Sequence, residues 1–141
     1  MSDDLARATA LLAGGDHTCV LCRGQETLTS DAGGVAALVD WHVQGRDLTG
    51  FSAADKVVGR AAALLYAAAG VRAVHAVLAG AAAEAVCRAH GIAFTAETTV
   101  PVVLNRARTT ACPMEAAVAG IDDPNAAATA LVAEVRRLRG H

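Results

Sequence analysis

The sequence predicts a single α/β domain, residues 1–141, in which a mixed β-sheet is sandwiched between helices. Its 141 residues are enough to bury one core and too few for two. The segment 71–78 is apolar apart from Arg72 and His75, which is typical of a central parallel strand. A hairpin pattern precedes alternating helix and strand patterns, and this order favours a mixed sheet with helices on its faces.

The first third of the chain predicts a helix followed by a hairpin and a second helix. A leucine stripe over residues 3–13 predicts a helix that Gly14 stops. Residues 17–22 and 26–29 are expected to form two antiparallel strands around a short turn. A second helix is predicted at about 34–43, and a loop follows it.

We expect the clearest helix to begin at Ser52 and to end at Gly70. Ser52 and Asp55 have the spacing of a capping box, in which the two side chains bond to free amides of the first helical turn. The run after Arg60 is apolar, so the second half of this helix should be buried on nearly all sides.

The remaining elements alternate in the way expected of strand–helix–strand units. Residues 80–90 predict a helix and 92–96 a strand, whereas 100–104 is apolar and extended and 105–111 is a polar loop. Two helices should follow, starting at Cys112-Pro113 and Asp123-Pro124, because proline prefers the first helical position.

Composition excludes several classes of protein. The chain is 54% hydrophobic and 18% charged, with 35 alanines, which excludes a disordered chain. A net charge of −2 argues against general nucleic-acid binding. The longest apolar run, about 11 residues at 61–71, is too short to cross a membrane, and the N-terminus does not resemble a signal peptide. We therefore expect a cytosolic protein with reduced thiols.

Cys112 is the first candidate functional residue. As the residue before Pro113 it should cap a helix, where free amides and the helix dipole lower a thiol pKa, and Glu115 would lie in the first turn. Arg106 and Arg108 could add positive potential. A buried structural cysteine is the alternative interpretation.

Asp55 and Lys56 form the second candidate pair. Of the 12 basic residues, 11 are arginine, so Lys56 marks a position where arginine could be unsuitable; a solvated lysine is the plainer reading. Helix starts gather at the carboxyl ends of parallel strands, and we therefore expect Cys112 and this pair to line one pocket. Asn105 and Arg106 would supply an amide and a charge to the ligand.

Three segments resemble a family of small bacterial and archaeal proteins of unknown function. They are Leu48-Thr-Gly-Phe-Ser-Ala-Ala-Asp-Lys-Val-Val-Gly59, Ala111-Cys-Pro-Met-Glu115 and Gly120-Ile-Asp-Asp-Pro124. The resemblance covers about residues 17–138, and it implies a cytidine-deaminase-like fold, a three-layer α/β/α sandwich.

The motifs of zinc deaminases are missing. Those enzymes place a His or Cys ligand and a catalytic Glu on one helix and Pro-Cys-x-x-Cys on the next. Here the corresponding helices offer Asp55-Lys56 and an alanine-rich start at Gly80, and Cys112-Pro113 has the reversed order. Cys19-x-x-Cys22 lies in an expected strand, where its thiols would face opposite sides. We predict no metal and no other cofactor.

Two hypotheses follow. In the first, the domain binds a small polar ligand, of nucleoside or nucleotide type, and if it is an enzyme Cys112 is the nucleophile, with Lys56 or Asp55 assisting proton transfer. The sequence assigns catalytic roles to Cys112, Lys56, Asp55 and Glu115, and ligand-binding roles to Ser52, Asn105, Arg106 and Thr110. In the second, the domain is non-catalytic and acts by self-association or partner binding. Flat alanine-rich helix surfaces favour a homodimer in either case.

Overall fold

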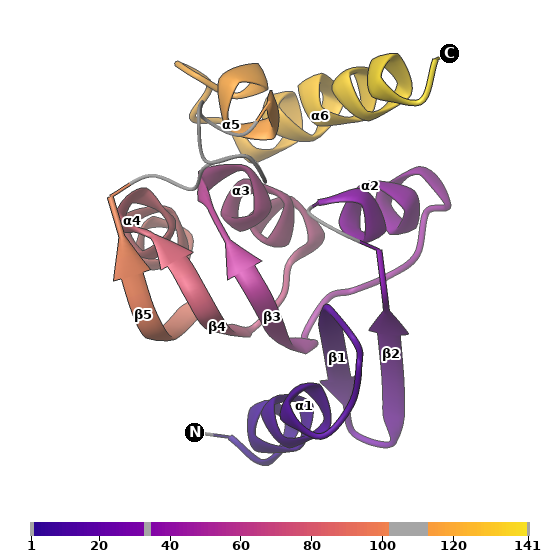
Figure 1. Ribbon diagram of the computed structural model, residues 1–141, viewed down its shortest axis with the longest axis vertical. Coiled ribbons are helices and arrows are strands. Elements are labelled where there is room, and N and C mark those ends of the chain that lie inside the picture. Colours follow the sequence, from indigo (N-terminus) through magenta and orange to yellow (C-terminus); the bar gives the residue numbers. More distant parts are fainter. Residues whose placement is uncertain (1, 33–34, 102–112, 141) are drawn as a thin grey trace.

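The computed structural model describes residues 2–32, 35–101 and 113–140, which form a five-stranded mixed sheet flanked by helices (Figure 1). In chain order the elements are α1 (Asp3–Ala13), β1 (Cys19–Arg23), β2 (Glu26–Ser30), α2 (Ala36–Val43), β3 (Ser52–Val58), α3 (Arg60–Ala69), β4 (Ala73–Gly80), α4 (Ala81–Ala89), β5 (Ala93–Val100), α5 (Pro113–Ala117) and α6 (Pro124–Leu138).

The sheet has the strand order β2-β1-β3-β4-β5. β1 runs antiparallel to both β2 and β3, whereas β3, β4 and β5 are parallel. α1 packs on one face, against β1 and β3. α3 and α4 connect the parallel strands over the other face, and α6 packs on the outer side of α2 and α3 (Figure 1). The predicted α/β class with a mixed sheet is therefore confirmed.

The helix predicted from Ser52 is wrong in its first half. Residues Ser52–Val58 form strand β3, which pairs with β1 on one side and β4 on the other. Alanine and valine suit both structures here, and the free energy gained by pairing two neighbours at the sheet centre outweighs local helix propensity. The helix begins at Arg60, with Gly59 as its N-cap, so Ser52 and Asp55 form no capping box.

Gly70 ends this helix as predicted. It adopts φ 76°, a left-handed conformation that glycine reaches without a steric penalty. A Cβ atom there would approach the Thr49 hydroxyl oxygen to 3.4 Å, so the position is crowded as well as left-handed.

The core is built from small and aliphatic side chains on both faces of the sheet. The larger cluster lies between the sheet and α2, α3, α4 and α6, with Tyr66 and Phe51 as its largest fully buried members. The smaller cluster lies under α1 and consists of Ala8, Leu12, Val20, Cys22 and Ala54. Cys19 and Cys22 belong to different clusters, which confirms that these two thiols face opposite sides of the sheet.

The C-terminal helices start where the prolines predicted. α5 begins at Pro113 and α6 at Pro124, and the Asp123 carboxylate accepts a hydrogen bond from the Ala126 amide at 2.8 Å. Strand β5 extends to Val100 and is longer than the predicted 92–96.

None of the described helices is long and apolar enough to cross a membrane.

Candidate functional site

Asp55 lies in the middle of β3 and points into the core below α3. Its side chain is buried, with 6% of the residue exposed. Oδ2 accepts a hydrogen bond from the Tyr66 hydroxyl at 2.7 Å, and Oδ1 accepts from the Val57 amide at 3.3 Å. Burial raises the pKa of Asp55 to about 7, against the opposing effect of these hydrogen bonds and that of the Lys56 amide.

Tyr66 connects Asp55 to a buried thiol. The Cys19 sulfur lies 3.3 Å from the Tyr66 hydroxyl oxygen, and Cys19 stands directly opposite Asp55 in the β1–β3 ladder. Burial raises the pKa of both the Cys19 thiol and the Tyr66 hydroxyl, and the Asp55 charge raises both further. Cys19, Tyr66 and Asp55 therefore form a buried polar cluster, in which the thiol and the tyrosine hydroxyl keep their protons at neutral pH, whereas Asp55 titrates near pH 7.

The start of α3 is bound by the carboxylate of Glu115, which is 54 residues away in sequence. The two carboxylate oxygens lie 3.2 and 3.3 Å from the Ala61 amide nitrogen, and the amide donates to them. Free amides of a first helical turn attract an anion, and Glu115 supplies one. Through Glu115, helix α5 thus contacts the helix that directly follows β3.

Arg60 fixes the same helix end to the turn between α5 and α6. Its guanidinium donates to the Val118 carbonyl at 2.6 Å, to the Ile121 carbonyl, and to the Asp122 carboxylate at 2.8 Å. The planar guanidinium of arginine carries several N–H donors, and here they bind two carbonyls and one carboxylate. The segment from Pro113 to Asp122 is consequently held against the start of α3 at two separate points.

The pKa of the Glu115 carboxyl group at this junction is raised above its usual value. Partial burial raises its pKa, whereas the Ala61 amide, the Arg60 charge and the Arg60 amide lower it. Burial is the largest of these influences, so the pKa of Glu115 lies above its usual value.

Lys56 does not share a pocket with Asp55. Neighbouring residues of a strand face opposite sides of the sheet, so Asp55 points toward α3 and Lys56 lies on the α1 face. There Lys56 lines a groove together with α1, His75 and Glu97. The expectation that the Asp55-Lys56 pair lines one site is therefore wrong, and proton transfer cannot involve both residues.

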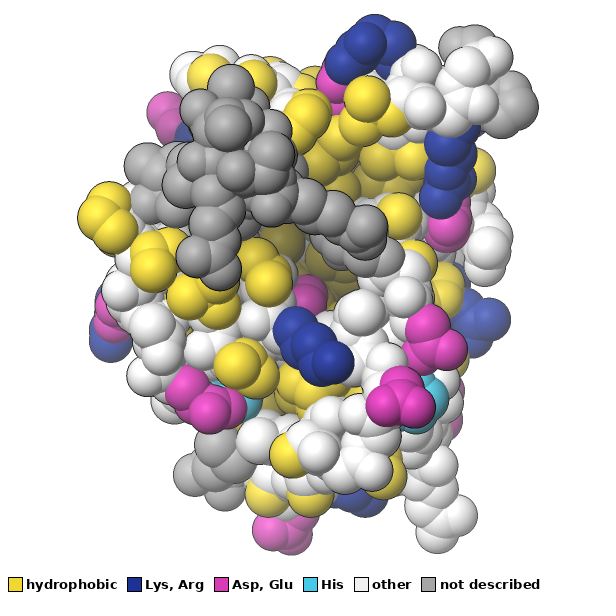
Figure 2. Space-filling view, viewed as in Figure 1, with side chains coloured by type: hydrophobic (Ala, Val, Ile, Leu, Met, Phe, Trp, Pro, Cys, Tyr) yellow, Lys and Arg dark blue, Asp and Glu magenta, His cyan; other side chains and the backbone are white. Residues whose placement is uncertain are grey.

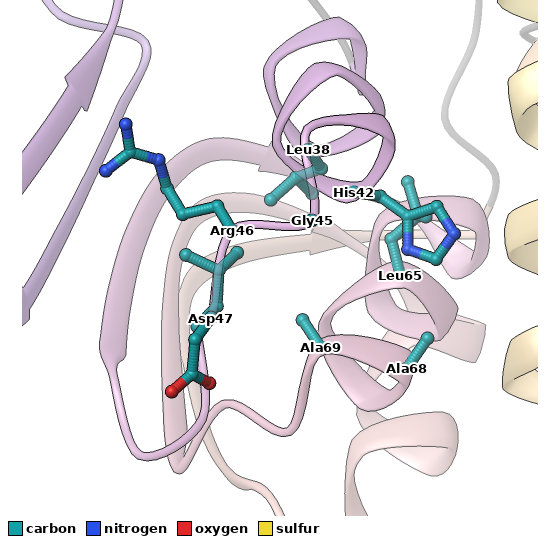
Figure 3. Close-up of a pocket in the computed structure, with 9 residues that line it drawn as sticks. Leu38, His42, Gly45, Arg46, Asp47, Leu65, Ala68 and Ala69 are labelled. Carbon is teal, nitrogen blue, oxygen red and sulfur yellow. The ribbon is translucent and has the colours of Figure 1, made fainter.

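A second concavity lies between α2, the following loop and the C-terminal half of α3 (Figure 3). Its volume is about 260 Å³, and its wall is formed by Leu38, Leu65, Ala68 and Ala69. In Figure 3 the charged ends of Arg46 and Asp47 point away from this wall. The Asp47 carboxylate instead accepts from the Thr49 amide at 3.0 Å. This pocket lacks converging polar groups, and we do not assign it a ligand.

Several predicted site residues lie outside the described residues, namely Asn105, Arg106, Thr110 and Cys112. Their roles stay predictions. Ser52, the remaining predicted ligand contact, is 1% exposed at the start of β3, and its hydroxyl oxygen has no hydrogen-bond partner among the described residues. It lies at the opposite end of β3 from the Glu115–Ala61 contact.

Local sequence patterns did not predict the polar contacts that Tyr66 makes with Cys19 and that His75 makes with Glu97. Thr95 and Glu97 alternate along β5, and both bond to His75 on the neighbouring strand, at 2.7 Å and 3.1 Å respectively. Polar residues at i and i+2 in a strand indicate a shared face, so this signal was present in the sequence.

The described residues contain no group of three His, Cys, Asp or Glu side chains able to hold a metal ion. On the face that Figure 2 displays, Lys and Arg side chains are scattered beside acidic ones, and hydrophobic side chains gather around α6. Cys112 lies outside the described residues, so the absence of a metal stays a prediction.

The comparisons with known proteins identify one family. The sequence model of a family described as "TM1506: Domain of unknown function (DUF1893)" matches residues 7–134. The crystal structure of a DUF1893 family protein (TM1506) from Thermotoga maritima is similar, with a TM-score of 0.84 and 23% sequence identity over 95% of this chain and 92% of that chain. No curated protein matches the sequence.

Proposed function

The chain belongs to the DUF1893 family, whose function is unknown, and we propose that it binds a small polar ligand where α5 meets the start of α3. The supporting observation is the contact between Glu115 and the Ala61 amide. It joins the Ala111–Glu115 motif to a helix residue that lies two positions beyond the Leu48–Gly59 motif. A Ser, Thr or Asp next to the helix would be enough to bind the free amides at the start of α3. Here the carboxylate that binds them comes from Glu115, which is distant in the sequence.

The ligand class follows from the groups at this junction. Arg60 contributes a cation, Glu115 a carboxylate that accepts hydrogen bonds, and the α3 start a positive helix-dipole end. A nucleoside or nucleotide offers both an anionic or hydroxylated part and amino groups that a carboxylate can accept from. We propose such a ligand, together with a cytidine-deaminase-like fold for the domain.

If the protein is an enzyme, Cys112 is its nucleophile and Glu115 is the group that moves the proton. Cys112 directly precedes Pro113, the first residue of α5. A thiol before a helix start is favoured as the thiolate, and a nearby carboxyl group with opposing pKa influences can accept or return a proton. We no longer assign the proton transfer to Asp55, because it is buried beside Tyr66. We no longer assign it to Lys56, because that residue lies on the other face of the sheet.

Alkylation of the folded protein by iodoacetamide tests this assignment. Cys19, Cys22 and Cys87 are buried, so they provide an internal control of unreactive thiols. We expect one rapidly modified cysteine, lost in Cys112→Ser, and slower modification in the presence of cytidine 5′-monophosphate. Equal, slow modification of all four thiols in the folded protein would contradict a reactive Cys112.

The cytosolic location stays a proposal from the sequence. The three described cysteines, Cys19, Cys22 and Cys87, are free.

A further inference from the structure

The α1 face of the sheet carries a groove that the proposed function does not use. Its volume is about 260 Å³. One wall is the end of α1 and the following turn, and the floor is the exposed face of β3, β4 and β5. The groove is lined by Thr9, Leu12, Ala13, Gly15, Lys56, His75, Val77 and Glu97.

Strand register places two opposite charges at the two sides of this groove. Asp55 pairs with Ala76, and Ala76 with Ala96. The next residues along the three strands, Lys56, Val77 and Glu97, therefore form one row across the sheet. Two strand spacings separate the backbones of Lys56 and Glu97 by about 10 Å, and the side chain of Val77 lies between them as an apolar floor.

The carboxylate at one side is held in position. His75 is 8% exposed, and its Nε2 lies 3.1 Å from Glu97 Oε2, while its Nδ1 lies 2.7 Å from the Thr95 hydroxyl. A buried imidazole that bonds to two neighbours on β5 restricts the rotamers of Glu97. The second carboxylate oxygen has no partner among residues 2–32, 35–101 and 113–140.

The Lys56 ammonium, at the other side of the groove, also has no partner among the described residues. Lys56 makes no ion pair within 4 Å with any residue in the described part of the chain, although Glu97 lines the same groove. It is also the one lysine in a chain with 11 arginines. Lysine presents a compact charge on a flexible stem, which suits a single anionic group better than the planar arginine fork.

We propose that this groove binds a small zwitterion whose anionic and cationic groups are separated by an apolar stretch, such as an ω-amino acid or a basic amino acid. The anionic group binds Lys56, the cationic group binds Glu97, and the methylene chain lies on Val77 and Leu12. The two opposite charges at the sides and the apolar floor between them match the charge pattern of such a molecule.

Titration with three matched probes, followed by amide NMR shifts, tests the proposal. The probes are 6-aminohexanoate, which has both charges, hexanoate, which has the anion, and hexylamine, which has the cation. We expect saturable shifts at Ala13, Gly15 and Val77 with 6-aminohexanoate. Each single-charge probe should bind about tenfold more weakly, because each loses one charge-assisted contact.

Two variants separate the contacts. Lys56→Met should reduce 6-aminohexanoate binding to the level of hexylamine, and Glu97→Gln should reduce it to the level of hexanoate. Arg88→Met changes an exposed cation of α4, on the other face, and should leave the titration unchanged. Absence of saturable shifts, equal binding of hexanoate and 6-aminohexanoate, or full binding by Lys56→Met would each overturn the proposal. Because Glu115 and Ala61 are not involved, these results do not depend on the ligand site proposed where α5 meets the start of α3.

Discussion

The Tyr66 hydroxyl donates a hydrogen bond of 2.7 Å to Asp55 inside the core, and these two residues belong to elements that local sequence patterns join into one helix. They are separated by the Gly59 break, so the strand carries the carboxyl group and the helix folds back over it. The hydrogen bond satisfies a group whose unpaired burial would be costly. Burial of the Asp55 carboxyl group raises its pKa, against the effect of this hydrogen bond, and so makes the stability of the fold depend on its protonation.

We expect folding stability to fall as pH rises from about 4 to about 7. The pKa of Asp55 is raised in the folded protein to about 7, so between these values the folded state keeps a proton that the unfolded state has released. The contribution is fully present below the unfolded pKa and absent above pH 7, and it amounts to about 4 kcal/mol at most. Urea unfolding across this pH range measures it.

Asp55→Asn removes the titrating group while keeping its shape, so its stability should lack this slope. Asp47→Asn is the matched control, because Asp47 is exposed and its pKa is lowered, by its hydrogen bonds to Thr49 above all. The account of Asp55 fails if the wild type and Asp55→Asn show parallel pH profiles.

Tyr66 should not ionise in the folded protein. It is the single tyrosine of the chain, and burial followed by the Asp55 charge raises its pKa well above the usual value. Tyrosinate absorbance at alkaline pH should therefore appear together with the loss of helical circular dichroism. A titration that is complete before unfolding would show that the hydroxyl is accessible to solvent.

Removal of the Arg60 side chain should release the α5–α6 turn. Arg60→Met loses the hydrogen bonds to Val118, Ile121 and Asp122, and we expect a loss of about 1–3 kcal/mol in unfolding free energy. Amide hydrogen exchange should accelerate more at residues 113–122 than in the sheet. Arg88→Met, which breaks an exposed pair within α4, should change neither quantity measurably. Uniform acceleration across the chain would argue that Arg60 does not hold this turn specifically.

Self-association stays a prediction, and one surface is suited to it. Val43 and Leu138 are each 54% exposed, and Val43 borders an open groove between α2 and α6. We expect a light-scattering mass near twice 14.2 kDa, shifting toward the monomer in Val43→Asp. A monomer mass at high micromolar concentration would remove the homodimer.

Patterning along the chain was sufficient for much of the fold. The hairpin, strand β4, the glycine end of α3 and the proline starts of α5 and α6 each depend on local chemistry that the sequence displays. Strand β3 could not be found in this way, because Ala53 and Ala54 favour a helix whereas the two valines favour a strand, so local propensity does not decide between them. Its conformation is decided by pairing with β1 and β4, which are distant in sequence.

Only part of the candidate site could be predicted, because the local sequence pattern of strand β3 predicts a helix. The prediction that Cys112 lines one pocket with the Asp55-Lys56 pair is untested for Cys112, which lies outside the described residues, whereas Glu115 of the same motif contacts Ala61, two residues beyond the Leu48–Gly59 motif. The mistaken helix, however, placed Asp55 and Lys56 on one exposed face. In a strand they separate, and Asp55 becomes a core residue while Lys56 joins His75 and Glu97, which no linear motif connects.

Titration of the ¹⁵N-labelled protein with cytidine 5′-monophosphate, followed at the Ala61 amide, tests the proposed ligand site most directly. The account predicts a saturable shift of Ala61 and of the neighbouring Arg60 amide, weaker with cytidine or inorganic phosphate alone, and abolished in Glu115→Ala. Glu84→Ala, an exposed change in the first turn of α4, should leave the shift intact. Saturation with no change at Ala61 and Arg60, or an unchanged titration in Glu115→Ala, would contradict a ligand site at the junction of α3 and α5.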